Sequence, residues 1–179
     1  SANIEWHVQP LSLDKFGEPL HSFSAITPSV CNLRPTSRGQ VSAISLDPLE
    51  HPRIKMNYLS TREDKNVAVD SIRLTRKIMK AKALQPFCPE EFQPGLSFEN
   101  EEELISAAGD LGSTIFHPVG TCKMGSDKSA VVSDRLLVHG MENLRIIDAS
   151  VMPTITSGNT NAPTMMIAEK GAEFILQDR

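Results

Sequence analysis

The spacing of hydrophobic residues changes along this chain, and that change constrains the fold more than any other feature. Near the start, Ile4, Trp6 and Val8 alternate with polar residues, a pattern that predicts a strand with one exposed face. After Thr61, apolar residues recur every three or four positions over some two dozen residues, which predicts an amphipathic helix. Strands and helices are therefore expected in separate regions of the chain.

Turn residues and prolines divide the rest of the chain into short segments. Extended segments are expected in residues 4–13, 23–30, 40–46, 131–138 and 143–148. A second helix is expected to begin near Asn100 and to end near His117, with glutamates near the positive end of its dipole. A last helix is expected to be capped by Asn161, with Pro163 in the first turn, where a missing N–H does no harm.

The charge balance excludes some classes of partner. The chain has 18 basic and 22 acidic side chains and a formal net charge of -4, so no global positive field is available to hold a nucleic acid or an anionic membrane. A cluster of basic residues on the first helix is expected to be a solvated face. No apolar stretch approaches the roughly 18 residues that a membrane span needs, and the start lacks the features of a secretion signal.

The cysteines point to a reducing compartment. The three residues, Cys31, Cys88 and Cys122, are odd in number and form no CxxC pair, which disfavours both a disulfide framework and a zinc site. The histidines at positions 7, 21, 51 and 139 do not have metal-ligand spacing. The sequence therefore predicts no metal and a cytoplasmic protein, or one peripheral to a membrane.

Three segments near the C-terminus carry the chemistry. They are FHPVGTCKMG at residues 116–125, RIIDAS at 145–150 and SGNTNAPT at 157–164. Alone, a histidine before a proline is more often a structural turn residue than a base. In this order and spacing, the segments resemble the C-terminal region of the glucose-methanol-choline (GMC) flavoprotein oxidoreductases, most closely the choline-dehydrogenase-like members. The resemblance also covers residues 31–39, 47–48 and 57–60.

The resemblance implies two catalytic residues. The family's proton acceptor for the substrate hydroxyl corresponds to His117, and its second active-site position corresponds to Asn159. Hydride leaves an alcohol carbon readily only when the oxygen becomes alkoxide-like, and an imidazole is a suitable base near neutral pH. An asparagine amide can hydrogen-bond to the same oxygen and orient the C–H bond.

The resemblance also implies which residues lie near FAD. It places Asp148 and Ala149 beside the cofactor, and the backbone of Thr160 and Asn161 near the flavin pyrimidine edge. The helix expected at Asn161 offers free N–H groups and a positive dipole end, which favour the negative charge of reduced flavin. An ordinary capped helix would have the same sequence, so only its location distinguishes the two interpretations.

The implied architecture is α+β. Residues 1–112 would supply an antiparallel sheet with helices, as part of a substrate domain, and residues 113–179 would complete an FAD-binding domain. The family binds the ADP part of FAD through a strand, a GxGxxG turn and a helix, and no such unit occurs in this sequence. We therefore expect the chain to begin within a longer protein, to need that N-terminal part as its partner, and to be inactive by itself.

The function implied is oxidation of a choline-like or other small alcohol by an FAD-dependent dehydrogenase or oxidase. A hydroxynitrile lyase of the same fold would keep the flavin and the base but transfer no hydride. A non-catalytic binding domain would not depend on His117. Alcohol-dependent flavin bleaching and the replacement of His117 separate these alternatives.

Overall fold

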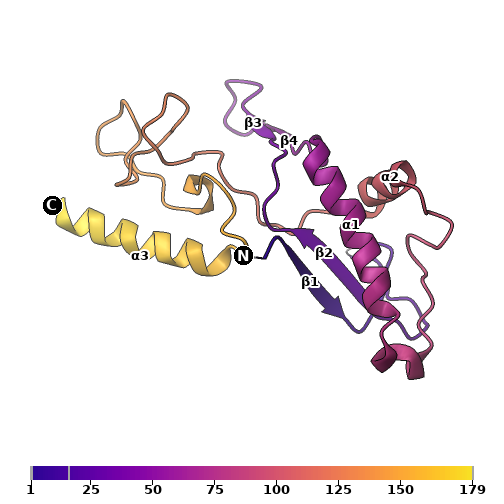
Figure 1. The fold of residues 1–179 in the computed structure, drawn as a ribbon. Coiled ribbons are helices and arrows are strands. Elements are labelled where there is room, and N and C mark those ends of the chain that lie inside the picture. The colour runs from indigo at the N-terminus through magenta and orange to yellow at the C-terminus, as the bar shows by residue number, and fades with distance from the viewer. Residues whose placement is uncertain (1, 16, 179) are drawn as a thin grey trace. The chain divides into compact units, whose positions relative to one another are not determined.

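The computed structural model describes residues 2–15 and 17–178. Two compact units are present (Figure 1). The first contains the residues up to Asn32 together with Tyr58–Ser113, and the second contains Leu33–Asn57 together with the residues from Thr114 onward. Residues 33–57 thus group with the C-terminal residues, whereas the sequence suggested a single boundary at residue 112. The assignment of these parts to a substrate domain and an FAD-binding domain stays a prediction.

A two-stranded antiparallel sheet opens the first unit. Strand β1 (Ile4–Gln9) pairs with β2 (Thr27–Asn32). Strand β1 is shorter than expected and β2 is shifted along the chain; β1 ends at Gln9, and Pro10 after it has no N–H for a ladder hydrogen bond. Burial, and after it the charge of Glu5, raises the pKa of the Cys31 thiol on β2.

Helix α1 (Arg62–Met79) begins where the sequence predicted. The side chain of Thr61 accepts a hydrogen bond from the Asp64 N–H at the N-terminus. The helix buries Val69, whereas part of the predicted apolar stripe is exposed. Trp6 Nε1 donates to Thr75 Oγ1 over 2.9 Å, so the Trp6 face of β1 packs towards α1.

The basic face of α1 is not wholly solvated. The guanidinium of Arg76 pairs with the carboxylate of Glu91 at 2.7 Å and donates to the carbonyls of Gly95 and Phe98. Arg76 thereby anchors the connection that follows the 3-10 helix η1 (Lys82–Phe87). The sequence could not show this role, because it depends on where the connection returns to the helix.

Helix α2 (Glu101–Leu111) starts at a capping box formed by Asn100 and Glu103. It ends earlier than expected, at Leu111, because Gly112 adopts an extended conformation. Helix α2 packs against α1, and Leu104 is fully buried.

The second unit begins with a short antiparallel hairpin of β3 (Gln40–Ser42) and β4 (Arg53–Lys55). Residues 131–138 and 143–148, expected as extended segments, contribute isolated bridges instead of strands. Left-handed backbone at Leu136 and Asn143 interrupts regular pairing there.

The core of the second unit lies between these loops, the 3-10 helix η2 (Ala149–Val151) and helix α3 (Asn161–Gln177). Its buried members are Val132, Leu136, Val151, Met152 and Ile167. Thr160, and not Asn161, is the N-cap of α3, and its side chain makes no capping hydrogen bond. Among the described residues, no helix combines the length and apolarity needed to cross a membrane.

Candidate functional site

His117 lies in a turn that requires unusual backbone conformations. Phe116 before it has a φ of 62°, and Gly120 after it has a φ of 87°. A Cβ on Gly120 would lie 3.4 Å from the Met152 carbonyl oxygen, so this glycine permits a close approach as well as the left-handed turn. The His117 side chain is half-buried.

Backbone hydrogen bonds hold the first motif against the second. The Cys122 N–H donates to the Ser150 carbonyl at 3.1 Å, and the Met124 N–H donates to the Val151 carbonyl at 2.8 Å. Both acceptors lie in η2, which follows directly after Asp148 and also contacts α3. The segment that carries His117 is therefore fixed to the core of its unit.

A side-chain hydrogen bond joins the first motif to the third. Thr160 Oγ1 lies 2.8 Å from His117 Nδ1, and Thr160 is 7% exposed. With Nδ1 engaged, Nε2 is the ring nitrogen left for a ligand. The family resemblance implies a backbone role only for Thr160, and the contact of its hydroxyl with His117 could not be inferred from the order of the residues.

The other predicted site residues lie around these segments. Asn159 directly precedes Thr160 and is exposed. Asn161 is the first residue of α3, where the helix leaves its first N–H groups without intrahelical partners. Asp148 is exposed, and its carboxylate accepts from the Ser150 N–H at 2.7 Å, so it caps η2, in which Ala149 is the first residue.

Sequence reasoning missed one further contact near the third motif. Arg34 Nε donates to Ser157 Oγ at 3.1 Å, and Ser157 has a φ of 59°. Arg34 belongs to the segment of residues 31–39 that contributed to the resemblance, but no spacing rule links it to a residue so far along the chain. The contact ties the loop before Asn159 to the other part of the same unit.

Residues 35–168, most of the chain, match the family model described as GMC oxidoreductase. The chain belongs to the GMC oxidoreductase family. This confirms the resemblance seen in the sequence.

Curated relatives of this GMC oxidoreductase include the oxygen-dependent choline dehydrogenases of Proteus mirabilis (strain HI4320) and Pseudomonas fluorescens (strain Pf-5). Each is 44% identical over 176 residues and matches 97% of this chain. The chain spans only 31% and 30% of their respective lengths.

Solved structures of similar fold include a pyridoxine 4-oxidase from Mesorbium loti, with a TM-score of 0.80 and 29% identity over 91% of this chain and 31% of that one. A formate oxidase from Aspergillus oryzae RIB40 gives a TM-score of 0.83 and 26% identity over 93% of this chain and 30% of that one. The α+β class expected for this GMC oxidoreductase, with antiparallel strands and helices, is confirmed.

Proposed function

We propose that the protein oxidises a small alcohol with FAD and that His117 accepts the hydroxyl proton. The observation that carries this proposal is the hydrogen bond between His117 and Thr160, because it joins the HPVGT and GNTN motifs in one unit. The relatives named as choline dehydrogenases favour choline or a similar alcohol as the substrate.

The hydrogen bond is compatible with the tautomer that a base needs. When Nδ1–H donates to Thr160 Oγ1, the lone pair of Nε2 is free to take the proton from the alcohol oxygen. The oxygen then becomes alkoxide-like, which lowers the barrier to loss of hydride from the adjacent carbon. Thr160 thus acts on the substrate through His117.

Asn159 is the residue we assign to orienting the substrate. Its exposed amide follows Gly158 and stands next to Thr160 in the chain, so it is available to hydrogen-bond to the alcohol oxygen. An amide that holds the oxygen in one place also fixes the direction of the C–H bond.

The start of α3 fits the polar edge of a flavin. The backbone N–H groups of Asn161 and Ala162 lack partners within the helix, and the Thr160 side chain does not cap them. Together with the helix dipole they would hold a partly negative group. Ala149 in the neighbouring η2 and its N-cap Asp148 would contact the cofactor beside it. Bound FAD would supply the acceptor of the hydride.

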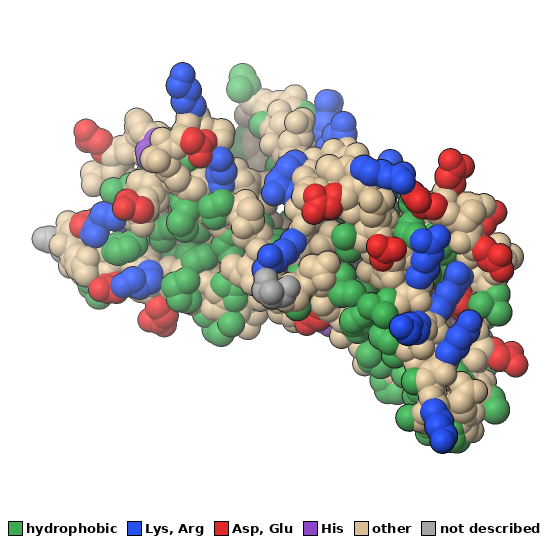
Figure 2. All heavy atoms as spheres, in the orientation of Figure 1, with side chains coloured by type: hydrophobic (Ala, Val, Ile, Leu, Met, Phe, Trp, Pro, Cys, Tyr) green, Lys and Arg blue, Asp and Glu red, His purple; other side chains and the backbone are tan. Residues whose placement is uncertain are grey.

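Helix α3 carries an apolar surface that suits a further part of the protein. Met165, Met166 and Leu176 are each more than half exposed, and in Figure 2 hydrophobic side chains gather where Figure 1 shows α3. An exposed apolar patch is characteristic of an interaction surface. We assign it to contact with an FAD-binding part like the one expected in the curated relatives, of which this chain spans only 31% of the length.

Anaerobic mixing of the full-length protein with choline or another small alcohol tests the proposed function. Bleaching of the flavin absorbance, with formation of the aldehyde, is the expected result. Release of hydrogen cyanide from a cyanohydrin, without bleaching of the flavin, would instead indicate a lyase. If protein that contains its flavin shows neither bleaching nor aldehyde formation with any of a panel of alcohols, the proposal is overturned.

A further inference from the structure

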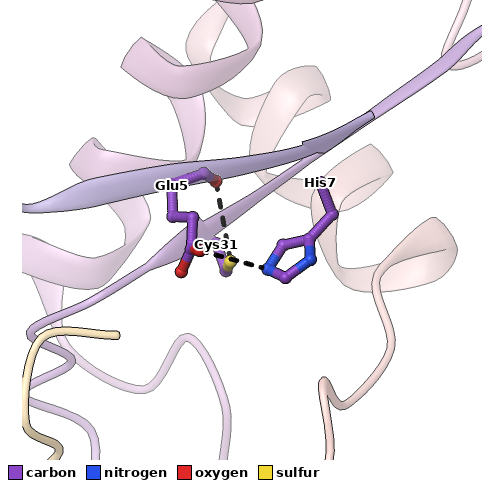
Figure 3. A group of neighbouring side chains, drawn as sticks. All are labelled: Glu5, His7 and Cys31. Carbon is purple, nitrogen blue, oxygen red and sulfur yellow. Dashed lines mark hydrogen bonds and ion pairs between the residues drawn. The ribbon is translucent and has the colours of Figure 1, made fainter. Parts of the chain in front are cut away.

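The strand register of the first unit brings three metal-binding residue types to one face of the sheet. Glu5 and His7 are two residues apart in β1 and therefore point to the same face. Cys31 in β2 is the register partner of Glu5. Trp6 points to the opposite face, towards α1, so the three residues lie on the side of the sheet away from α1 (Figure 3).

The side chains on this face converge. One ligand atom from each of Glu5, His7 and Cys31 lies within 4.8 Å of the others, and His7 Nε2 is 3.7 Å from Glu5 Oε1. Figure 3 shows the imidazole, the carboxylate and the sulfur directed towards the same space. All three residues belong to the same unit and to two hydrogen-bonded strands, so their spacing is set by the sheet.

One atom of the cluster makes no hydrogen bond to any described residue. His7 Nε2 is inaccessible to solvent, and no hydrogen bond to it is present within the described part of the chain. A buried nitrogen with no hydrogen bond is unfavourable, so a group that bonds to it would stabilise the fold. The neighbouring carboxylate lies beyond hydrogen-bonding distance, which leaves space for such a group.

We propose that Glu5, His7 and Cys31 bind a zinc-class divalent cation. Thiolate and imidazole are the ligands that Zn²⁺ prefers, and a carboxylate oxygen completes a set found in protein zinc sites. Calcium and magnesium do not fit, because they require mainly oxygen ligands and this set has one carboxylate. Three protein ligands leave a fourth tetrahedral position for water or a small ligand.

The distances require only a small adjustment of side chains. Metal–ligand bonds of about 2.0 to 2.3 Å place the ligand atoms of a tetrahedral site about 3.3 to 3.8 Å apart. The distance between His7 Nε2 and Glu5 Oε1 is already in that range. The other distances in the cluster are at most 4.8 Å, so a shift of the Cys31 sulfur by no more than about 1.5 Å brings it to the same spacing.

Linear spacing in the sequence predicts no metal. The number of residues between His7 and Cys31 does not indicate a metal site. The pairing of β1 with β2 brings the two residues together. The site is independent of the proposed role of His117, which lies in the other unit. Failure of one proposal therefore leaves the other standing.

Cobalt titration tests the site. The full chain, without a histidine tag and freed of metal with a chelator, is titrated anaerobically with Co²⁺ and then with Zn²⁺. The expected result is one Co²⁺ per chain, with a thiolate-to-cobalt charge-transfer band and the visible bands of tetrahedral cobalt, which Zn²⁺ abolishes. Cobalt spectra without the thiolate band, or no binding at all, would overturn the proposal.

Variants identify the ligands. Cys31→Ser should remove the charge-transfer band. His7→Gln should weaken cobalt affinity by more than about a hundredfold, because losing a metal ligand costs more than losing a residue that only hydrogen-bonds to a ligand. Cys88→Ser and His51→Gln replace exposed residues outside the cluster and should leave both properties unchanged. Circular dichroism verifies the fold of each variant. If Cys31→Ser does not fold, His7→Gln decides, and an unchanged affinity in that variant contradicts the site.

Discussion

Thr160 Oγ1 and His117 Nδ1 lie 2.8 Å apart, although 43 residues separate them in the chain. The contact engages one ring nitrogen and leaves Nε2 as the nitrogen that we propose to accept the proton; a hydrogen bond to one ring nitrogen is a common way to orient a histidine base. Because Thr160 is also the N-cap of α3, the same residue links the base to the helix start that we assign to the flavin.

Replacing Thr160 tests whether its hydroxyl positions His117. Thr160→Val keeps the shape but removes the hydrogen bond, so flavin reduction in the full-length protein should slow by about tenfold, equivalent to roughly one hydrogen bond. Thr160→Ser keeps the hydroxyl and should restore most of the rate. Equal rates in the two variants would show that the hydroxyl has no positioning role.

Asn159→Ala tests the orienting amide. The rate of flavin reduction should fall, because removing one hydrogen bond to the reacting oxygen raises the activation free energy by about 1 to 3 kcal/mol. Flavin content, measured from the absorbance spectrum, should be unchanged. A variant that folds normally but has lost its flavin would assign Asn159 to the cofactor and not to the substrate.

Gly171 tests the packing of α3. A Cβ at Gly171 would lie 2.6 Å from Ile147 Cγ2, so Gly171→Ala should overpack the core by about 1 to 3 kcal/mol, against a helix-propensity gain of about 1 kcal/mol. Ile147→Ala removes the clashing atoms, and in that background Gly171→Ala should become stabilising. Thermal unfolding of the four proteins gives the coupling energy.

Gly109 is the matched control for that cycle. It lies within α2, and a Cβ there would meet nothing within 4 Å. Gly109→Ala should therefore raise the free energy of unfolding by up to about 1 kcal/mol. A similar gain for Gly171→Ala in the unmodified background would contradict the close approach of Ile147.

The chain alone should bind FAD weakly. The start of α3, with Asp148 and Ala149, offers contacts to one side of a flavin, and a large ligand loses several kcal/mol of freedom on binding. Purified by itself, the 179-residue chain should be colourless and should not oxidise alcohols. Stoichiometric bound FAD would show that these residues form a complete cofactor site.

Local signals in the sequence predicted where α1 and α2 begin. Thr61 and Asn100 each cap a helix through their own side chains, so the start of α1 and of α2 depends on nearby residues alone. The end of α2 and the strand limits were less accurate, because pairing partners and the conformation of Gly112 decide them.

The candidate site was predictable only as a set of motifs. Order and spacing in the sequence indicated His117 and Asn159 through the family, and the family itself is confirmed. The contacts that join the motifs, from Thr160 to His117 and from Arg34 to Ser157, depend on tertiary packing. The cluster of Glu5, His7 and Cys31 likewise depends on strand register, which linear spacing does not contain.

The rate of flavin reduction in the His117→Ala variant tests the central claim most directly. Anaerobic stopped-flow mixing of the full-length protein with its alcohol measures that rate without the later reaction with an electron acceptor. The variant should be slower by about a hundredfold to ten-thousandfold, with its flavin retained, while His51→Ala, at an exposed position, should match the unmodified protein. Near-normal reduction in the His117→Ala variant would contradict the role of His117 as the base.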